Sequence, residues 1–400
     1  MRDHDLLIVG GGPVGLSLAC ACSGLGLRLA LVEQKPKAES TLMRTKDPKA
    51  IALSFSSQRF FEALGIWPHL APFTCPIKSV HVSEKGALGR TILKPSDVGL
   101  SQIEVLGNVI QADQLQAVLE GIVNQLPDVT RFYDMSITQH QDLPNPLIVA
   151  ADGSHSALRE SAGLPTTKTH YQETAIVAYA DLERDHNGMA FERFTPEGPI
   201  ALLPFGEKAA KVVWILPTET AKQRLAEDEP SFQQALQAAF GLHTPIGQFL
   251  KITHRSSYPL QGIVAEQPFC NRLVLVGNAA TTLHPIAAQG LNLALRDVAR
   301  LAETLYQAKR LGQPIGAKST LAKYARWRSA DYQRVSQATH QLHKVFQTPL
   351  KPLRTVRRLS LLLLNQVPPL KRHITELGMG LIPDLPKLSR GLSLAPVLSA

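Results

Sequence analysis

Cysteine is scarce in this chain of 400 residues, which has four, at positions 20, 22, 75 and 270. They form no C-x-x-C pair, so their spacing excludes a disulfide framework, a zinc finger and a thioredoxin-like redox motif. Four separate thiols in so long a chain indicate a reducing, cytosol-like compartment. We expect them to act as small buried hydrophobic residues.

Long apolar runs are also missing. Three consecutive glycines and Pro13 interrupt the uncharged stretch from Leu6 to Leu27, and the run from Leu359 to Leu364 has only six residues. A helix that crosses a bilayer needs ~20 apolar residues. We therefore predict no membrane-spanning helix and no export signal.

Acidic residues are few in the last fifth of the chain. The net charge is +9, and after residue 319 there are 13 Lys or Arg residues against three Asp or Glu. The rest of the chain is nearly neutral, so the basic character belongs to the C-terminal section. No nucleic-acid recognition motif accompanies this charge, and we predict no nucleic-acid partner.

Part of this basic section has the pattern of an amphipathic helix. Between Leu350 and Asn365, one helical side carries Leu353, Val356, Leu359 and Leu363, and the other carries Lys351, Arg354 and Arg358. Such a helix fits peripheral contact with an anionic membrane. It equally fits a solvated basic face on a helix that packs against the body or a partner.

The N-terminus contains a nucleotide-binding pattern. A buried strand over 5–9 runs into Gly10-Gly11-Gly12-Pro13-Val14-Gly15, a helix follows, and a second strand over 27–32 ends at Glu33. Gly10 permits the tight turn, Gly12 lets a diphosphate approach the backbone, and Gly15 lets the helix pack close to the strand. The diphosphate then meets the N-terminus of the helix, and Glu33 accepts hydrogen bonds from a ribose. This pattern alone does not distinguish FAD from NAD.

Two later segments indicate that the bound dinucleotide is FAD and not NAD. The strand over 273–276 ends at Gly277-Asn278, and a helix over Leu291–Tyr306 begins after Gln289-Gly290. The first N–H groups of that helix would stabilise negative charge on a reduced flavin ring. The strand over 147–150 runs into Asp152-Gly153, a turn that a ligand can approach closely, although an ordinary strand-to-helix connection has the same pattern.

The order of these three segments resembles that of flavoprotein aromatic hydroxylases of the para-hydroxybenzoate hydroxylase type. The similarity extends over roughly residues 3 to 345 and is greatest to the ubiquinone-biosynthesis hydroxylases, with Asn278 and Thr282–Pro285 most like the 2-octaprenyl-6-methoxyphenol hydroxylase branch. The other matching stretches are Ala50–Ser54, Leu64–Trp67, Ala190–Thr195, Gly198–Pro204 and Arg255–Leu260.

The resemblance implies an α/β fold with a Rossmann-like FAD-binding domain, an inserted, mostly antiparallel β-sheet substrate domain and a helical C-terminal section. We assign residues 1–72, 102–168 and 268–345 to the FAD-binding domain, 73–101 and 169–267 to the substrate domain, and 346–400 to the basic tail. Strands over 191–195, 200–204 and 211–216 would form a sheet above the flavin.

The function that the resemblance implies is FAD-dependent aromatic hydroxylation, as in class A monooxygenases. One oxygen atom of O2 would enter a prenylated phenol of ubiquinone biosynthesis, such as 2-polyprenyl-6-methoxyphenol, with NAD(P)H as the transient reductant and no metal. We expect a cytoplasmic protein, with peripheral contact at the inner face of the cell membrane and a ubiquinone-biosynthesis complex as further partners.

Site residues follow from the motifs and from the resemblance. His284, next to Pro285, is the candidate that takes the phenol proton, and the alternative is a structural histidine whose ring bonds the backbone. The aromatic and aliphatic side chains of the sheet are substrate candidates or plain core: Phe194, Leu203, Phe205 and Trp214. The FAD candidates are Gly10, Gly12, Pro13, Val14, Gly15, Glu33, Arg44, Lys49, Gln114, Asp152, Gly153, Arg159, Gly277, Asn278, Gln289, Gly290, Leu291 and Asn292.

The chain departs from the family at three points, and two of them, Ala288 and a shortened segment, suggest the first of two rival functions. Lys49 replaces the usual Arg, Ala288 replaces a loop glycine, and the segment before Asp152 is too short for three ordinary strands. A catalytically weakened structural subunit of a quinone-synthesis complex is one rival. A flavin dehydrogenase or reductase on the same fold is the other.

Overall fold

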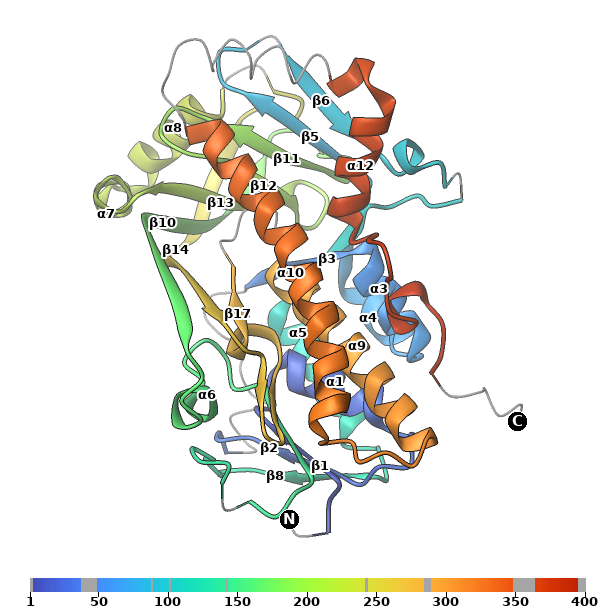
Figure 1. Cartoon of the computed structure of the whole chain (residues 1–400). Helices are drawn as coiled ribbons and strands as arrows, with labels where there is room; N and C mark the ends of the chain where they lie inside the picture. The colour runs from blue at the N-terminus through green and yellow to red at the C-terminus, as the bar shows by residue number, and fades with distance from the viewer. Residues whose placement is uncertain are drawn as a thin grey trace.

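The structure is a computed structural model that describes residues 3–36, 49–87, 89–100, 102–141, 143–241, 244–283, 289–347 and 364–394, with the backbone alone for 338–347. Strands in these residues form three sheets, which we call sheets A, B and C. Sheet A lies at one end of the molecule and sheet C at the other (Figure 1).

Sheet A follows from short apolar runs that are buried on both faces, as the strands of a parallel sheet usually are. Its central strands pair in parallel, with β9 and β2 on either side of β1 and β16 beyond β9. Helices α1 (Pro13–Cys22), α5 (Ala112–Val123) and α9 (Gly290–Arg310) share the main core with it. In spatial order the strands are β15 (Phe269–Cys270), β16 (Leu273–Leu275), β9 (Leu147–Ala150), β1 (Leu6–Val9), β2 (Leu29–Val32) and β8 (Val129–Phe132).

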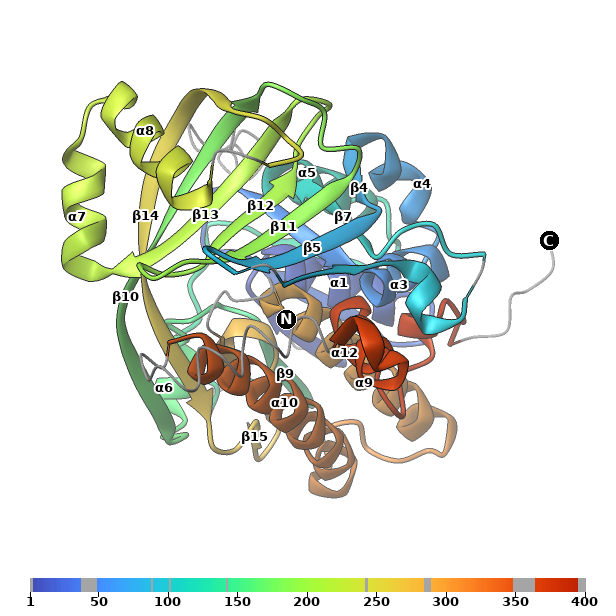
Figure 2. The same ribbon diagram turned by 90° about the horizontal axis from the view of Figure 1, so that it is seen from above.

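Sheet C is mostly antiparallel, and only β11 and β5 pair in parallel within it. Helices α7 (Thr218–Ala226) and α8 (Glu229–Phe240) cover its outer face (Figure 2), where Trp214 packs on Phe232. The spatial order is β17 (Thr281–Thr282), β14 (Phe249–Ala265), β10 (Thr166–Leu182), β13 (Ala209–Pro217), β12 (Ile200–Pro204), β11 (Met189–Phe194), β5 (Ser79–Glu84) and β6 (Arg90–Leu93).

Sheet B consists of β3 (Ala50–Ser54), β7 (Gly107–Gln111) and β4 (Thr74–Ile77). Helices α3 (Phe55–Ala63) and α4 (Trp67–Leu70) follow β3. Although β4 falls in the stretch assigned to the substrate domain, it pairs with β7 and not with sheet C. Strand β4 contains Pro76, and no local sequence pattern indicates which sheet such a strand joins.

The segment between β8 and β9 contains no further strand in its described residues 133–141 and 143–146. This agrees with the expectation that the stretch before Asp152 is too short for three ordinary strands. The chain instead returns toward sheet A through Met135, Ser136 and Ile137, which line the cavity described below.

The C-terminal section is helical where it is described. Helix α10 (Lys318–Gln347) crosses the front of the molecule, and α12 (Pro368–Met379) lies beside the η2 turn (Pro95–Val98) at the edge of sheet C (Figure 1). The short η5 turn (Leu388–Arg390) packs on α3. Residues 351–363, which carry most of the predicted amphipathic pattern, lie outside the described residues.

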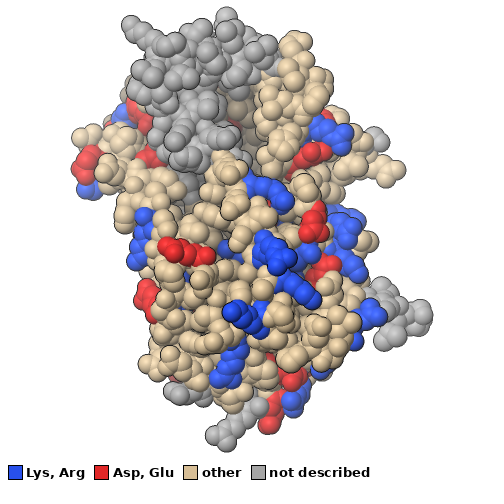
Figure 3. Space-filling view, viewed as in Figure 1, with Lys and Arg blue, Asp and Glu red and all other residues tan. Residues whose placement is uncertain are grey.

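Basic side chains gather along the middle of the face that α10 crosses (Figure 3). Among the described residues, no helix is both long enough and apolar enough to span a bilayer. Cys20 and Cys22 are buried free thiols, and burial raises the pKa of both to about 12. These two therefore behave as the small hydrophobic residues that we expected, whereas Cys75 and Cys270 are only partly buried.

Candidate cofactor and substrate site

A large cavity lies where sheet A, sheet B, the inner face of sheet C and α12 meet. Its volume is about 2000 Å³, roughly twice the upper end of the ~300–1,000 Å³ typical of small-molecule sites. Gly10–Val14, Asp152–Gly153, Asn278 and Gln289–Asn292 all line it. The three predicted cofactor segments, far apart in the chain, therefore open on one cavity.

The glycine turn after β1 has the geometry that a diphosphate requires. Gly10 has a φ of +112°, and a Cβ on it would lie 2.4 Å from the carbonyl oxygen of Ala151. A Cβ on Gly15 would lie 1.9 Å from the carbonyl oxygen of Gly10, so only glycine lets α1 pack this close to the turn. A Cβ on Gly12 would meet nothing within 4 Å, because that position faces the cavity.

The N-terminus of α1 opens on the same space. Gly12 is its N-cap and makes no side-chain hydrogen bond to the first turn, and Pro13 occupies the first helical position. The N–H groups of a first turn have no partner within the helix, and the helix dipole adds positive potential there. An anion at Gly12 would therefore be stabilised.

Glu33 follows β2 and fixes the glycine turn. Its two carboxylate oxygens accept hydrogen bonds from the N–H of Gly11 at 2.8 Å and the N–H of Lys35 at 2.9 Å. The side chain lines the cavity, and carboxylate oxygens have further lone pairs for a ribose hydroxyl. Gln116 of α5 secures the turn from the other side by donating to the carbonyl of Gly11 at 2.8 Å.

The turn after β9 presents Asp152 and Gly153 to the cavity. Asp152 Oδ2 accepts a long hydrogen bond of 3.4 Å from the N–H of Leu158, whereas its Oδ1 is buried without a described partner. A buried acceptor of this kind needs a partner, because leaving it unsatisfied costs about 1–3 kcal/mol. A hydroxyl of a bound cofactor would supply it.

Arg159 is a positioning residue and does not line the cavity. Its guanidinium is buried and donates to the carbonyl of Ala279 at 2.9 Å and to that of Ser154 at 3.0 Å. It thereby joins the turn after β9 to the turn after β16. Since Arg159 does not itself line the cavity, its predicted cofactor role would be indirect, through these two turns.

The turn after β16 brings Asn278 to the cavity, with its side chain exposed there. Gly277 has a φ of +57°, and a Cβ on it would lie 3.1 Å from the Val14 side chain. Gly277 therefore lets this turn pack against α1 without lining the cavity itself. Gln289, the N-cap of α9, makes no side-chain capping hydrogen bond, so the first turn of α9 faces the cavity through Gly290, Leu291 and Asn292.

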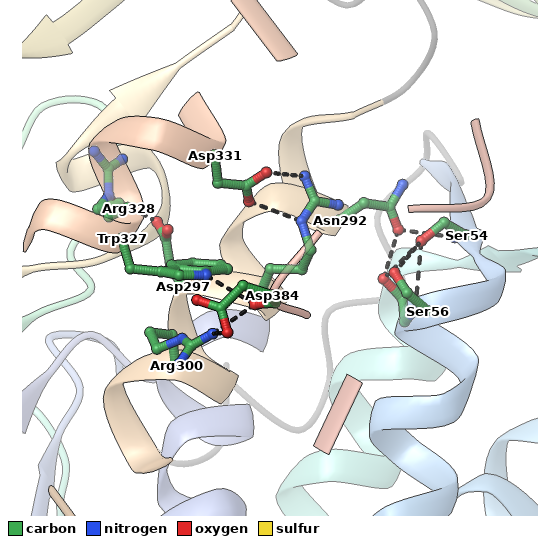
Figure 4. A network of polar contacts seen from close by, with 11 residues as sticks. Ser54, Ser56, Asn292, Asp297, Arg300, Trp327, Arg328, Asp331 and Asp384 are labelled. Atoms are coloured by element: carbon green, nitrogen blue, oxygen red, sulfur yellow. Dashed lines mark hydrogen bonds and ion pairs between the residues drawn. The ribbon is translucent and has the colours of Figure 1, made fainter. Parts of the chain in front are cut away.

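Asn292 fastens α9 to sheet B (Figure 4). Its Oδ1 accepts hydrogen bonds from the N–H of Ser54 and from the Ser57 hydroxyl, both at 2.8 Å. Its Nδ2 donates to the carbonyl of Ala52 at 2.9 Å. With these bonds, Asn292 sets the start of α9 relative to β3.

Buried ion pairs fasten α9 to α10 one turn further along (Figure 4). Arg296 pairs with Asp331 at 2.8 Å, and Arg328 pairs with Asp297 at 3.1 Å. Burial is the main cause that raises the pKa of Asp297 to about 6, against the opposing effect of Arg328. Removing one partner of such a pair leaves an uncompensated buried charge, so these pairs hold the helices in one arrangement.

These observations fit FAD as the bound group. Two helix N-termini, an acidic residue after the second strand and an unsatisfied buried oxygen face one long cavity. Lys49 also lines it, with its ammonium 5.0 Å from the ring centre of Tyr258. Gln114 is not among the lining residues, whereas Asp113 and Gln116 are. Arg44, His284, Pro285 and Ala288 lie outside the described residues.

Only some of the predicted substrate residues on sheet C line the cavity. Phe194 and Leu203 line the cavity. Trp214 does not, because alternate residues of a strand face opposite sides and Val213 and Ile215 take the cavity side. Phe205 stacks on Tyr179 with ring centres 4.9 Å apart and is also not a lining residue.

Sequence reasoning missed two contributors to this cavity. Glu192 of β11 lines the cavity, although Phe194 was the residue of that strand that we predicted for the site. Helix α12 lines it through Leu370, Ile374 and Leu377, among others, whereas for the tail we predicted either a membrane contact or packing against the body or a partner, without a role in the site. The alternation of residues along a strand puts 190, 192 and 194 on one face, and this pattern could have placed Glu192 beside Phe194. No sequence pattern indicates that α12 lies beside sheet C.

The comparison with known proteins now fits the geometry. A family model described as an FAD binding domain matches residues 3–339. The chain belongs to this family. Ubiquinone hydroxylase UbiL of Rhodospirillum rubrum is 32% identical to it, over 98% of this chain and 93% of that protein. The 3-demethoxyubiquinol 3-hydroxylase of Escherichia coli is 27% identical, over 95% and 99%.

Solved structures share the fold. The p-nitrophenol 4-monooxygenase PnpA from Pseudomonas putida has a TM-score of 0.75 at 16% identity, over 93% of this chain and 96% of that one. The predicted family, fold class and FAD cofactor are thus confirmed. The chain is an FAD-dependent monooxygenase.

The glycine turn gives a first prediction. Gly12→Asp leaves the fold intact because a side chain there meets no atom, yet it weakens FAD binding about 100-fold, because the carboxylate repels the diphosphate. Flavin absorbance after reconstitution and dialysis measures this loss. Gly121→Asp is the matched control, since that glycine in α5 also has open space and does not line the cavity. Equal flavin content in both variants would contradict the assignment.

Proposed function

We propose that this protein hydroxylates the ring of a prenylated phenol in ubiquinone biosynthesis, with 2-polyprenyl-6-methoxyphenol as the favoured substrate. NAD(P)H supplies two electrons, one oxygen atom of O2 enters the ring and the other leaves as water. The observation that carries the proposal is that the cofactor cavity continues into an apolar compartment. The names of the relatives, ubiquinone hydroxylase and 3-demethoxyubiquinol 3-hydroxylase, support the substrate class.

The apolar compartment lies between sheet C and α12. Its walls are aliphatic on both sides: Val80, Val82, Leu93, Leu203, Leu364, Leu370, Ile374, Leu377 and Leu381. A cofactor of two nucleotides does not need such walls, and a polyprenyl chain does, because burial of its apolar surface contributes ~25 cal/mol per Å². The cavity volume of about 2000 Å³ leaves room for this chain beside FAD.

Helix α12 is held firmly as a wall of this compartment. Lys371 pairs with Asp97 at 3.0 Å, on the η2 turn beside sheet C. After the helix, Asp384 pairs with Arg300 of α9 at 3.1 Å and accepts a hydrogen bond from the Trp327 indole at 2.9 Å (Figure 4). The C-terminal section thus connects the substrate compartment to the helix whose first turn faces the cofactor.

The chain's residues place the reactants and exclude water. Bound FAD would supply the redox chemistry. The glycine turn and Glu33 hold one end of it, and the first turn of α9 provides N–H groups for the charge that appears on reduction. The apolar faces of sheet C and α12 keep water from the phenol ring.

The rival functions make different demands on this site. A flavin dehydrogenase would reduce or oxidise its substrate without inserting oxygen. A weakened structural subunit would not need a firmly built cofactor turn, whereas Gly10, Gly15 and Glu33 are all in place here. Peripheral membrane contact and a ubiquinone-biosynthesis complex remain predictions for the basic tail.

Labelled oxygen tests the proposal. FAD-loaded protein is given NADH or NADPH, ¹⁸O2 and 2-farnesyl-6-methoxyphenol, and the product is analysed by mass spectrometry. We expect one ¹⁸O atom per product molecule. Product without the label would favour a dehydrogenase, and the absence of any turnover with bound flavin would favour the structural subunit.

The role of α12 gives a further prediction. Leu370 lines the cavity at its exposed edge, with 49% of its surface accessible, so Leu370→Asp leaves folding unaffected. We expect the KM for the farnesylated phenol to rise about 10-fold or more, because a charge meets the prenyl chain, while the KM for the chain-free phenol stays unchanged. Leu311→Asp is the control, at a 68% exposed leucine away from the cavity. Equal effects on both phenols would contradict this role.

A further inference from the structure

Glu192 is an acidic residue on the inner face of sheet C, among apolar neighbours. It lies on β11 between Ala190 and Phe194, which face the cavity with it. Its neighbours across the ladder are Ala201 of β12 and Val82 of β5, which also line the cavity. A carboxyl group is therefore set in an apolar part of the cavity wall.

This carboxyl has no hydrogen-bond or ion-pair partner among the described residues. The side chain is half-buried where it faces the cavity, and loss of hydration there raises its pKa from the ordinary 4.5 to about 7. An unpartnered carboxyl in an apolar wall is costly to the fold, and a structural role would normally come with a partner. A group poised to titrate near neutral pH in a cavity is typical of a functional acid or base.

Other titratable groups share the cavity but are not near enough to cause this shift. Sheet C contributes one on the same face, and Lys211 donates its ammonium hydrogen to the carbonyl of Ala50 at 2.5 Å. The other titratable residues that line the cavity are Glu33, Lys35, Lys49, Asp113, Asp152, His155, Arg334, His373 and Glu376.

Glu192 and the first turn of α9 line the same cavity, and strand β3 connects the parts of the molecule that carry them. The Lys211 contact joins sheet C to the first residue of β3, and the last residue of β3, Ser54, bonds Asn292 in the first turn of α9. Strand β3 thus connects the inner face of sheet C with the helix start, and residues of all three elements line the cavity that Glu192 lines.

We propose that Glu192 accepts the proton of the substrate phenol, an inference that rests on the proposed function. The phenol O–H bond breaks, its proton goes to a carboxylate oxygen of Glu192, and the electron pair stays on the phenol oxygen, which makes the ring more nucleophilic. When the hydroxylated product leaves, Glu192 returns the proton to that oxygen. The sequence had suggested His284 for this task, on a stretch that the structure does not describe.

The test is the pH profile of kcat/KM for 2-farnesyl-6-methoxyphenol with FAD-loaded protein. Wild-type activity should rise with pH through about 7, the pKa of Glu192. In Glu192→Gln, product formation at neutral pH should fall about 100-fold, the rise near pH 7 should disappear, and activity should partly recover at alkaline pH where the phenol ionises by itself. NAD(P)H oxidation should continue and yield hydrogen peroxide in place of product.

Two controls separate the outcomes. Asp181→Asn changes an exposed carboxyl on β10 of the same sheet and should leave the profile unchanged. Glu192→Gln should raise the melting temperature more at about pH 8 than at about pH 5, because the free-energy cost of the raised pKa builds up between the ordinary 4.5 and about 7 and reaches its full value above that range. That result would show that the variant folds and that the carboxyl is buried.

A Glu192→Gln variant that keeps the wild-type profile and product yield would overturn the inference. So would an equal loss of activity at every pH, which would indicate a purely structural role. If wild-type protein with bound flavin forms no labelled product, the proposed function itself fails, and that result is distinguishable from the failure of Glu192 alone.

Discussion

The parallel pairing of β16, β9, β1 and β2 is the constraint on which the rest of the molecule depends. Parallel strands end at the same edge of a sheet, so the turns after β1, β9 and β16 meet there, although about 270 residues of chain separate the first from the last. Each turn would be an ordinary connection by itself. Together they form the wall of one cavity with two helix N-termini, and this convergence makes a dinucleotide site.

The parts of the molecule around this edge of sheet A would position the substrate beside the cofactor. Sheet B carries the start of α9 on one side through Asn292 and contacts sheet C on the other through Lys211. The ion pairs between α9 and α10 and the bonds of Asp384 hold the C-terminal section in place. The site is therefore polar where the nucleotide would bind and apolar where a prenyl chain would bind, with the Glu192 carboxyl on the sheet C side.

Much of this could be predicted from sequence because local patterns carry it. The strand, glycine turn and helix at the N-terminus are specified by neighbours in the chain, and so are β9 and α9. To predict which side of sheet C a residue faces, one must know the register of the strands. In the structure, Trp214 belongs to the outer core and Glu192 faces the cavity. Residues such as Gln116 and helix α12 reach the cavity through contacts between distant segments, for which a single sequence contains no local signal.

The most direct test of the account is a crystal structure of the protein with FAD bound. The account predicts a diphosphate beside Gly12, a ribose hydroxyl at Glu33 and a flavin ring between the first turn of α9 and the inner face of sheet C. A cofactor that touches only one of the three turns, or a ring that points away from sheet C, would contradict it.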